Sequence, residues 1–498
     1  MTAMHSTIPE KVGLPYWMDR VLQEHAKVGA DLAADAVHDL RISLRRCILI
    51  ADVMRDLDPG ADWKGMRKAA KHIFNRLGSL RDSQVLAEWI EKLRAPGDAS
   101  SDPLVQSLKD RSERERSAAR DAIREFDRKQ WRAWTAKLAS HYRHVASDRP
   151  ACESIVYETW DAVRDLHRCA QKSGSRVAYH RLRVGLKKFR YAVENFLPPL
   201  YVEWAPDLKF LQDVLGQAHD LNVLGQAIAQ QKGLMDETAR GEWIKKLREE
   251  GSARIEQYRR KMAGKSSPLW TWREGLPGER KLRAGGLARL GQWSYFLTPD
   301  ASRTRRVARL SLQLHDGLAN CGLAGRGSDF DERTILQAAA LLQEVGHSHE
   351  GKPHHKEAYR MIRRISPPAG WTRKDLELVA LIARFHRRAL PRPDHKVLRA
   401  YDFPKRHSLI LLASILRFAN AFRAKPYRNV RRLEVEDVSG VIVVRAEGFS
   451  DQDPLESKLS EARRLLEFAC QRSVHILAPG SRMMSPRIVR PATRIDAA

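Results

Sequence analysis

The sequence predicts a mainly α-helical protein: a duplicated helical bundle, then a second helical domain with a small α/β appendage at its C-terminal end. Three observations support this fold class. Apolar residues recur at intervals of three and four over long stretches, where β-branched runs are scarce. A motif from the first of these stretches returns later in the chain. One segment near the C-terminal end alternates apolar and polar residues, as a β-hairpin does.

The helical pattern runs almost unbroken over residues 15–262, where we expect two repeats, at about 15–140 and 150–262. A stretch rich in Gly, Pro, Ser and Asp interrupts the first repeat at 94–103 and indicates a loop. The segment 263–286 is rich in Gly and Pro, so it is predicted to be a linker and the domain boundary.

The second domain is predicted to span residues 287–478. It is helical in pattern up to residue 424. A hairpin at 431–447, a helix near 456–470 and a short strand near 474–477 would then complete the appendage. Residues 479–498 carry Pro, Arg and Ser with little periodicity, and we expect them to be disordered.

The charge balance of the chain points to anionic partners. The 498 residues include 88 Lys and Arg against 61 Asp and Glu, which leaves a formal charge of +27. Such an excess favours nucleic acid, an acidic membrane surface or a phosphate polymer. The five cysteines form no CxxC pair, so we expect neither a disulfide framework nor a cysteine-based zinc site. Neither a signal peptide nor a run of about 20 apolar residues is recognisable, and we expect a cytoplasmic protein with no membrane span.

The repeat of the first half is carried by two blocks that return in the same order. The run HDLRISLRR at 38–46 returns as HRLRVGLKK at 180–188. Further along each half, LGSLRDSQVL at 77–86 corresponds to LGQAHDLNVL at 215–224. Two ordered matches with nearly the same spacing indicate a duplicated helical unit.

The first block of each repeat places a basic stripe on one face of a helix. At 100° per residue, His38, Arg41 and Arg45 fall within an arc of about 60°. Residues 176–190 hold six Lys or Arg and no Asp or Glu. A face that is merely solvated would mix both signs, so we interpret the stripes as binding surfaces. The stripe of the second copy consists of His180, Arg183, Lys187 and Arg190.

These motifs resemble the CHAD family, the conserved histidine α-helical domain, over roughly residues 20–260. The resemblance implies two helical bundles related by a pseudo-two-fold axis, with a basic channel between them that binds polyphosphate. It also implies association with polyphosphate granules. The second copy departs from the first by carrying His219 where the first has Arg81. Mapped onto this sequence, the lining of the channel consists of His38, Arg41, Arg45, Arg46, Lys71, Arg81, His180, Arg183, Lys187, Lys188, Arg190 and Lys209.

The second half is similar to the C-terminal HD-like domain of the exopolyphosphatase/guanosine pentaphosphatase family, over roughly residues 290–475. The runs at 306–317, 337–347, 354–359 and 378–388, each with one or two histidines, carry this similarity. An HD-type phosphohydrolase needs an early His, an adjacent His-Asp pair and a late Asp to hold a catalytic metal. Arg and Gln do not replace imidazole as metal ligands, so we predict no metal, no cofactor and no catalytic residue. The three positions fall on Arg303, Gln343-Glu344 and Asn420.

Several alternatives for the second half remain. It is expected to be a non-catalytic domain, and its basic residues form either a second anion site or a solvated face. A centre rebuilt from Glu344 with His347, His354, His355 and His386 would instead make the protein a metal-dependent phosphohydrolase acting on polyphosphate or guanosine polyphosphate. The predicted second anion site consists of His354, His355, Lys356, Arg384, Arg387 and Arg388.

The favoured function is therefore non-catalytic binding of inorganic polyphosphate. General nucleic-acid binding is a weaker alternative, because sequence-tolerant binding of single strands uses aromatic stacking platforms and aromatic residues make up only 7% of the chain. No GxGxxG or GxxxxGK[ST] loop occurs to cradle a nucleotide. The oligomeric state is not predicted.

Overall fold

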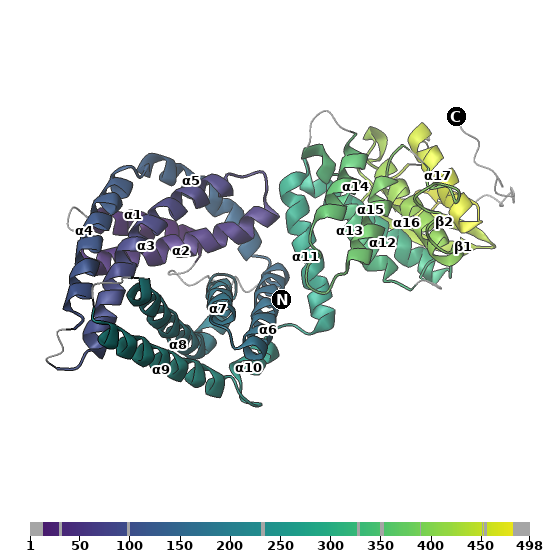
Figure 1. The fold of residues 1–498 in the computed structure, drawn as a ribbon. Helices are drawn as coiled ribbons and strands as arrows, with labels where there is room; N and C mark the ends of the chain where they lie inside the picture. The colour runs from purple at the N-terminus through teal and green to yellow at the C-terminus, as the bar shows by residue number, and fades with distance from the viewer. Residues whose placement is uncertain are drawn as a thin grey trace. The chain divides into compact units, whose positions relative to one another are not determined.

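The computed structural model describes residues 13–28, 32–96, 100–230, 235–325, 329–348, 353–388, 390–450, 452 and 456–481. The chain divides into two compact units, Met1–Gly285 and Gly286–Ala498 (Figure 1). The fold is mainly α, as the sequence predicts. Within the described ranges, no helix combines the length and apolarity that a membrane span requires.

The first unit contains two successive sets of helices, drawn in purple to blue and in teal in Figure 1. The first set is α1 (Leu14–Val28), α2 (Ala34–Leu57), α3 (Trp63–Leu93), α4 (Asp102–Arg124) and α5 (Arg128–Ala146). The second set is α6 (Arg149–Ser173), α7 (Arg176–Phe196), α8 (Pro198–Gln230), α9 (Glu237–Lys261) and α10 (Pro268–Gly275).

Equivalent helices of the two sets touch each other. Within each set the helices pack in chain order, with α2 between α1 and α3 and with α7 between α6 and α8. Between the sets, α2 contacts α7 and α3 contacts α8. These are the helices that carry the two repeated blocks, so the duplicated motifs face each other across the centre of the unit.

Local sequence signals set the ends of these helices. The Asp62 side chain caps α3 by accepting from the backbone N–H of Gly65, and the Ser175 hydroxyl caps α7 by accepting from that of Ala178. Gly174 ends α6 at a φ of 60°, in the left-handed conformation that glycine adopts without strain. This tight junction lets α7 begin directly after α6.

Buried polar contacts join the two repeats. The Arg46 guanidinium on α2 pairs with the Glu194 carboxylate on α7, with Nη2 at 2.8 Å from Oε1, and it lies 4.0 Å from the ring of Trp17. The Trp17 indole N–H donates to Asn195 Oδ1 at 3.1 Å, and the Tyr142 hydroxyl donates to the carbonyl oxygen of the same asparagine at 2.6 Å. A pair of charges buried in this way fixes the relative position of α2 and α7.

The segment 263–286, predicted to be a linker, is largely helical in the structure. Its Pro268 opens α10, a position where the missing N–H costs nothing, and α11 (Glu279–Leu297) begins before the segment ends. Trp272 of α10 is fully buried, with its ring centroid 5.1 Å from that of Phe189 and 6.4 Å from that of Trp204. Gly264, Pro268, Gly275, Pro277 and Gly278 therefore lie at helix ends or between helices, whereas Gly285 and Gly286 lie inside α11. The helix α10 packs into the second repeat as its fifth helix.

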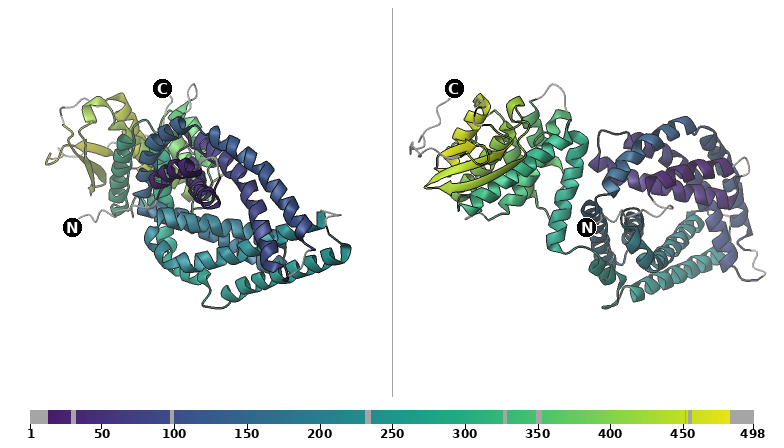
Figure 2. Two further views of the ribbon diagram at one scale, coloured as in Figure 1. Left: turned by 90° about the vertical axis from the view of Figure 1, so that its left-hand side faces the viewer. Right: turned by 180° about the vertical axis from the view of Figure 1, so that it is seen from behind.

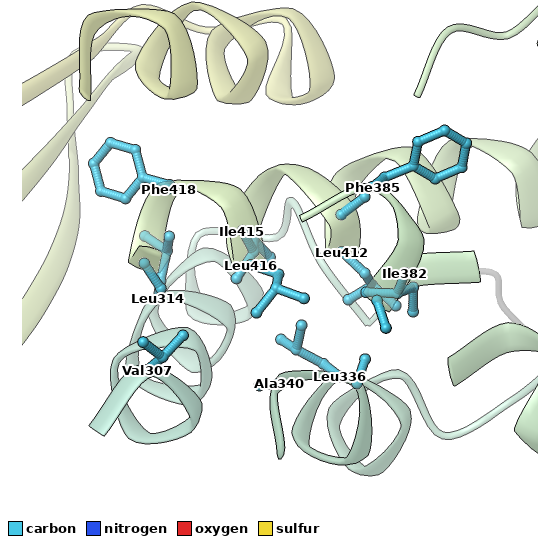
Figure 3. Close-up of a cluster of buried hydrophobic side chains, with 14 of the residues drawn as sticks. Val307, Leu314, Leu336, Ala340, Ile382, Phe385, Leu412, Ile415, Leu416 and Phe418 are labelled. Carbon is cyan, nitrogen blue, oxygen red and sulfur yellow. The ribbon is translucent and has the colours of Figure 1, made fainter. Parts of the chain in front are cut away.

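The second unit is a helical domain built around one apolar core. Side chains of α12, α13, α15 and α16 meet in this core, with Leu314, Leu336, Ile382 and Leu416 at its centre (Figure 3). The helices are the part of α11 from Gly286 on, α12 (Ala301–Asn320), α13 (Glu332–Leu342), α14 (His354–Arg364), α15 (Arg373–Arg384), α16 (Phe403–Ala421) and α17 (Ser457–Cys470), with 3-10 turns at Val345–Ser348 and Lys425–Tyr427.

A three-stranded sheet completes the second unit, as the right-hand view of Figure 2 shows. The strand β1 (Arg432–Val438) pairs antiparallel with β2 (Val441–Glu447), and β3 (Val474–Leu477) pairs parallel with β2. The hairpin, the helix α17 and the last strand lie where the sequence predicts them. Of the tail predicted to be disordered, residues 482–498 lie outside the described residues.

Candidate anion-binding site

Four cations of the duplicated motif gather where α2 contacts α7: Arg41 and Arg45 from the first repeat, and Arg183 and Lys187 from the second. We call these four residues the basic cluster. Burial lowers the pKa of both Arg183 and Lys187, and the charge of Arg45 lowers each further; Arg41 also contributes to the shift of Lys187. Charges perturb one another in this way only when they lie close together. The structure thus brings cations of both repeats onto one surface.

The first repeat holds its arginines against Phe74 on α3. Arg41 Nη1 donates to the Phe74 carbonyl oxygen at 2.7 Å, and its guanidinium lies 4.5 Å from the ring centroid. The guanidinium of Arg45 lies 5.1 Å from the same ring. Gly78 leaves room for this arrangement, because a Cβ there would lie 2.8 Å from Arg41 Nη1. Burial, followed by the charge of Arg45, lowers the pKa of Arg41 to about 10, so the side chain stays charged at neutral pH.

The second repeat presents cations with fewer partners. Arg183 Nε is buried and, across the described part of the chain, finds no hydrogen-bond acceptor. Burial, then the charges of Arg45 and Arg183, lowers the pKa of Lys187 to about 7. An ammonium desolvated among other cations is stabilised by any anion that reaches it.

Two histidines border the cluster on the second repeat. His180 Nδ1 lies 3.2 Å from His219 Nδ1 on α8. Burial lowers the pKa of His180, and Arg183 and Lys187 lower it further, which is the direction expected for a histidine that begins a basic stripe. Burial and then Arg183 lower the pKa of His219 to about 4, so this ring is neutral at physiological pH.

Two carboxylates of the second repeated block lie within the field of the cluster. Burial raises the pKa of Asp82, while the charge of Arg41 opposes the shift. Burial raises the pKa of Asp220 to about 6, against the charge of Arg183. The two carboxylates offset part of the positive charge, but they do not neutralise four cluster cations together with Arg81.

Two of the predicted channel residues face inward instead. Arg46 is buried and held by Glu194, so it is not available to a ligand. Arg190 Nη2 and Nη1 donate to the Tyr201 hydroxyl at 3.0 Å and to Gln212 Oε1 at 2.9 Å. Both side chains hold helices together because acceptors of the bundle satisfy them, and we remove both from the site.

The remaining predicted residues come from the same four helices, α2, α3, α7 and α8. Arg81 is half-buried, and its Nη1 donates to Glu88 Oε1 at 2.9 Å. Helical spacing places Lys71 on the same face of α3 as Gly78 and Asp82, and the equivalent Lys209 on α8 repeats this placement. Apart from Arg81, these remaining residues have exposed side chains: His38, Lys71, Lys188 and Lys209.

The second unit also gathers the residues of its predicted anion site. Burial lowers the pKa of His355, and the next contributions come from Arg388, Lys356, Arg384 and Arg387. The charges of these side chains therefore act on His355. The ring of His354 stacks on that of His347 at 4.1 Å.

The positions equivalent to HD-type metal ligands do not fit a metal. Asn420 Nδ2 donates to Gln343 Oε1, and Arg423 forms an ion pair with Glu344. The carboxylate that a metal would need is thus already paired with a guanidinium. Elsewhere in the described ranges, no three His, Cys, Asp or Glu side chains are grouped to hold a metal ion.

Taken together, the duplicated bundle and the shared cluster define a helical protein with a basic surface between two repeats. Residues 18–229 match the family model of the CHAD domain, and residues 294–443 match that of Ppx/GppA phosphatase, domain III. The chain therefore joins a CHAD domain to a Ppx/GppA domain III, as the motifs indicate, and the pair of domains points to a polyphosphate-related function. No curated protein matches the chain.

Proposed function

We propose that this protein binds inorganic polyphosphate, without chemistry of its own, on the surface shared by α2, α3, α7 and α8. The observation that carries the proposal is the basic cluster, because its four cations come from both repeats and outnumber the two carboxylates, Asp82 and Asp220, that act on them. A linear polyanion lying across α2 and α7 would contact each of them. Binding of this kind would also place the protein on polyphosphate granules.

The properties of two cluster cations favour binding of an anion whose charges are closely spaced. Lys187, with a pKa of about 7, and the buried Nε of Arg183 both gain from a phosphate oxygen, which supplies negative charge and a hydrogen-bond acceptor at once. Affinity then comes mainly from charge neutralisation and counterion release.

Polyphosphate fits this surface better than single-stranded nucleic acid does. Binding of bases needs exposed aromatic faces on which they can stack. The ring of Phe74, on the cluster side of α3, is already covered by Arg41 and Arg45. A polymer that consists of phosphate alone has no such requirement.

A filter-binding assay with long-chain polyphosphate tests the proposal. The double variant Arg41→Ala/Arg183→Ala should bind about a hundredfold more weakly, because it loses two charge-assisted contacts worth about 1.5 kcal/mol each. The matched control Arg132→Ala/Arg168→Ala removes the same charge from α5 and α6 and should bind like the wild type. Single-stranded RNA should compete poorly. Unchanged binding by the double variant, or RNA as the stronger competitor, would contradict the proposal.

For the second unit, we propose an additional anion contact at Lys356, Arg387 and Arg388, the exposed members of the group around His355. The variant Arg387→Ala/Arg388→Ala should weaken polyphosphate binding by less than about tenfold, since exposed charges contribute little individually.

We further propose that the second unit does not hydrolyse polyphosphate, because Arg303, Gln343 and Asn420 stand at ligand positions of an HD-type centre and Glu344 is paired with Arg423. Incubation with Mg²⁺ or Mn²⁺ should release no phosphate from polyphosphate or guanosine polyphosphate. Release that a chelator abolishes would establish the phosphohydrolase alternative instead.

A further inference from the structure

The second repeat contains a cavity that the proposed function does not use. It lies among the N-terminal part of α7, α8 and α9, and its volume is about 760 Å³. Small-molecule sites fall within the range of roughly 300–1,000 Å³. Its apolar wall comes from Val177, Leu215, Ile244, Leu247 and Ile255.

The cavity adjoins the basic cluster. His180 and His219 line it, and the pKa of each is lowered first by burial and then also by the charges of Arg183 and Lys187. A ligand in the cavity could therefore extend past these two rings onto the cations that we assign to phosphate.

The cavity occurs in the second repeat, where residues that differ from their equivalents in the first repeat line it. Leu80 of the first repeat is fully buried, whereas the equivalent Ala218 is smaller and leaves space beside α8. Ser83 donates to Glu115 at 2.9 Å, whereas the equivalent Leu221 offers only an apolar surface. Four of the five positions at which the second block departs from the first line the cavity: Leu80 is replaced by Ala218, Arg81 by His219, Ser83 by Leu221 and Gln84 by Asn222.

Polar groups around the apolar wall restrict the kind of ligand. Arg176 Nη1 donates to Asn222 Oδ1 at 2.9 Å, and Arg259 Nε donates to the Tyr179 hydroxyl at 3.0 Å. Asn222, together with Gln226 and Ser252, supplies hydrogen-bonding groups along the wall. The Ser252 hydroxyl already donates to the Arg248 carbonyl oxygen at 2.8 Å, but an alkyl chain would offer no hydrogen-bond partner to the Asn222 and Gln226 amide groups. Inorganic polyphosphate would gain nothing from the apolar surface. A flat, polar-edged organic group joined to phosphates satisfies both.

We propose that the cavity receives the nucleoside of a nucleoside polyphosphate, whose phosphate chain lies on Arg183 and Lys187. The proposal rests on the proposed function in one respect: the same cations bind phosphate in both cases. The chain would then distinguish an organic polyphosphate from an inorganic one, through the second repeat alone.

Calorimetric titration of the full chain in Mg²⁺-free buffer tests the proposal with ATP, GTP and inorganic tripolyphosphate. Tripolyphosphate carries at least as much charge as either nucleotide, so charge alone gives the nucleotides no advantage. We expect at least one nucleotide to bind about tenfold more tightly than tripolyphosphate, because its base and ribose are buried.

A cavity-filling variant locates the effect. Gly251 lines the cavity, and an added Cβ there meets no atom within 4 Å, so Gly251→Leu is expected to fill part of the cavity. It should abolish the advantage of the nucleotide and leave binding of long-chain polyphosphate within twofold. Gly241→Leu is the matched control, because Gly241 lies exposed on the same helix with equally open space and does not line the cavity.

The possible failures are distinguishable. Equal affinities for nucleotides and tripolyphosphate, or a nucleotide advantage that survives in Gly251→Leu, would overturn the cavity assignment. Tighter binding of a prenyl diphosphate than of either nucleotide would overturn it too, since that ligand has an apolar chain without hydrogen-bonding edges. A wild type that binds neither tripolyphosphate nor long-chain polyphosphate would refute the proposed function itself.

Discussion

The two repeats of the CHAD domain share a motif but present their cations differently. In the first repeat, Arg41 and Arg45 rest on Phe74, and Arg41 donates to a backbone carbonyl. In the second, Arg183 has a buried N–H without an acceptor among the described residues, and Lys187 has a pKa near neutrality. The first repeat therefore supplies fixed, permanent charge, and the second supplies charge that responds to its surroundings.

The difference shows how a duplicated motif diverges while both copies keep their cations. A pseudo-symmetric cluster needs cations from both sides, but it does not need identical ones. Because Arg stays protonated and Lys can lose its proton when desolvated, replacing Arg45 by its equivalent Lys187 makes one half of the surface sensitive to pH. The cavity beside His219 adds a second asymmetry.

The largest expected effect is on the stability of the fold. It concerns the equivalent positions Arg46, which is buried, and Lys188, which is exposed. Arg46→Ala leaves Glu194 as an unpaired buried charge, and we expect a loss of about 3–5 kcal/mol of unfolding free energy. Lys188→Ala, at an exposed side chain, should change it by less than about 0.5 kcal/mol. Urea denaturation followed by tryptophan fluorescence measures both. Equal effects would mean that the buried pair does not hold the repeats together.

The second prediction concerns pH. Lys187 gains its proton as pH falls through about 7, so the affinity for long-chain polyphosphate should rise by up to about tenfold from pH 8 to pH 6. Protonation of Asp220, whose pKa is about 6, acts in the same direction because it removes a negative charge.

Lys187→Arg should flatten this dependence to less than about threefold by making the charge permanent, and the reverse change Arg45→Lys should keep or steepen it. Filter binding at constant ionic strength gives both profiles. An affinity that falls on acidification would contradict the predicted direction.

The smallest expected effect comes from giving the second repeat a residue of the first. His219 is neutral at pH 7, so His219→Arg adds a permanent cation and should tighten polyphosphate binding by about threefold. The same change should reduce the nucleotide advantage, since the longer side chain occupies the edge of the cavity. Weaker polyphosphate binding by this variant would show that His219 acts as more than a neutral neighbour.

Much of the fold was predictable from periodicity and repetition. The alternation of apolar residues located the β1–β2 hairpin, and the repeated blocks located the helices that meet at the centre of the first unit. The segment containing α10 was misjudged because Gly and Pro signal helix ends and linkers alike. Only the burial of Trp272 against Phe189 and Trp204 separates the two cases, and that burial depends on tertiary packing.

The candidate site was predictable to about the same extent as the fold. Helical spacing placed Arg41 and Arg45 on one face, and the same geometry puts Arg46 about 100° away from Arg45, toward the partner repeat. Its partner Glu194 lies far along the chain, so sequence spacing does not reveal the pairing. The cavity depends on small differences in side-chain volume, such as Leu80 against Ala218, and these become meaningful only once the helices are placed.

The central claim is that cations of both repeats act on one ligand, and the salt dependence of polyphosphate affinity tests it most directly. With about eight contacts, the slope of log K against log salt should be roughly −6, taking about −0.7 per contact. Arg41→Ala/Arg183→Ala should flatten that slope by about 1.4, whereas Arg132→Ala/Arg168→Ala should leave it unchanged. A slope that is the same in all three proteins would show that the cluster does not touch the polymer.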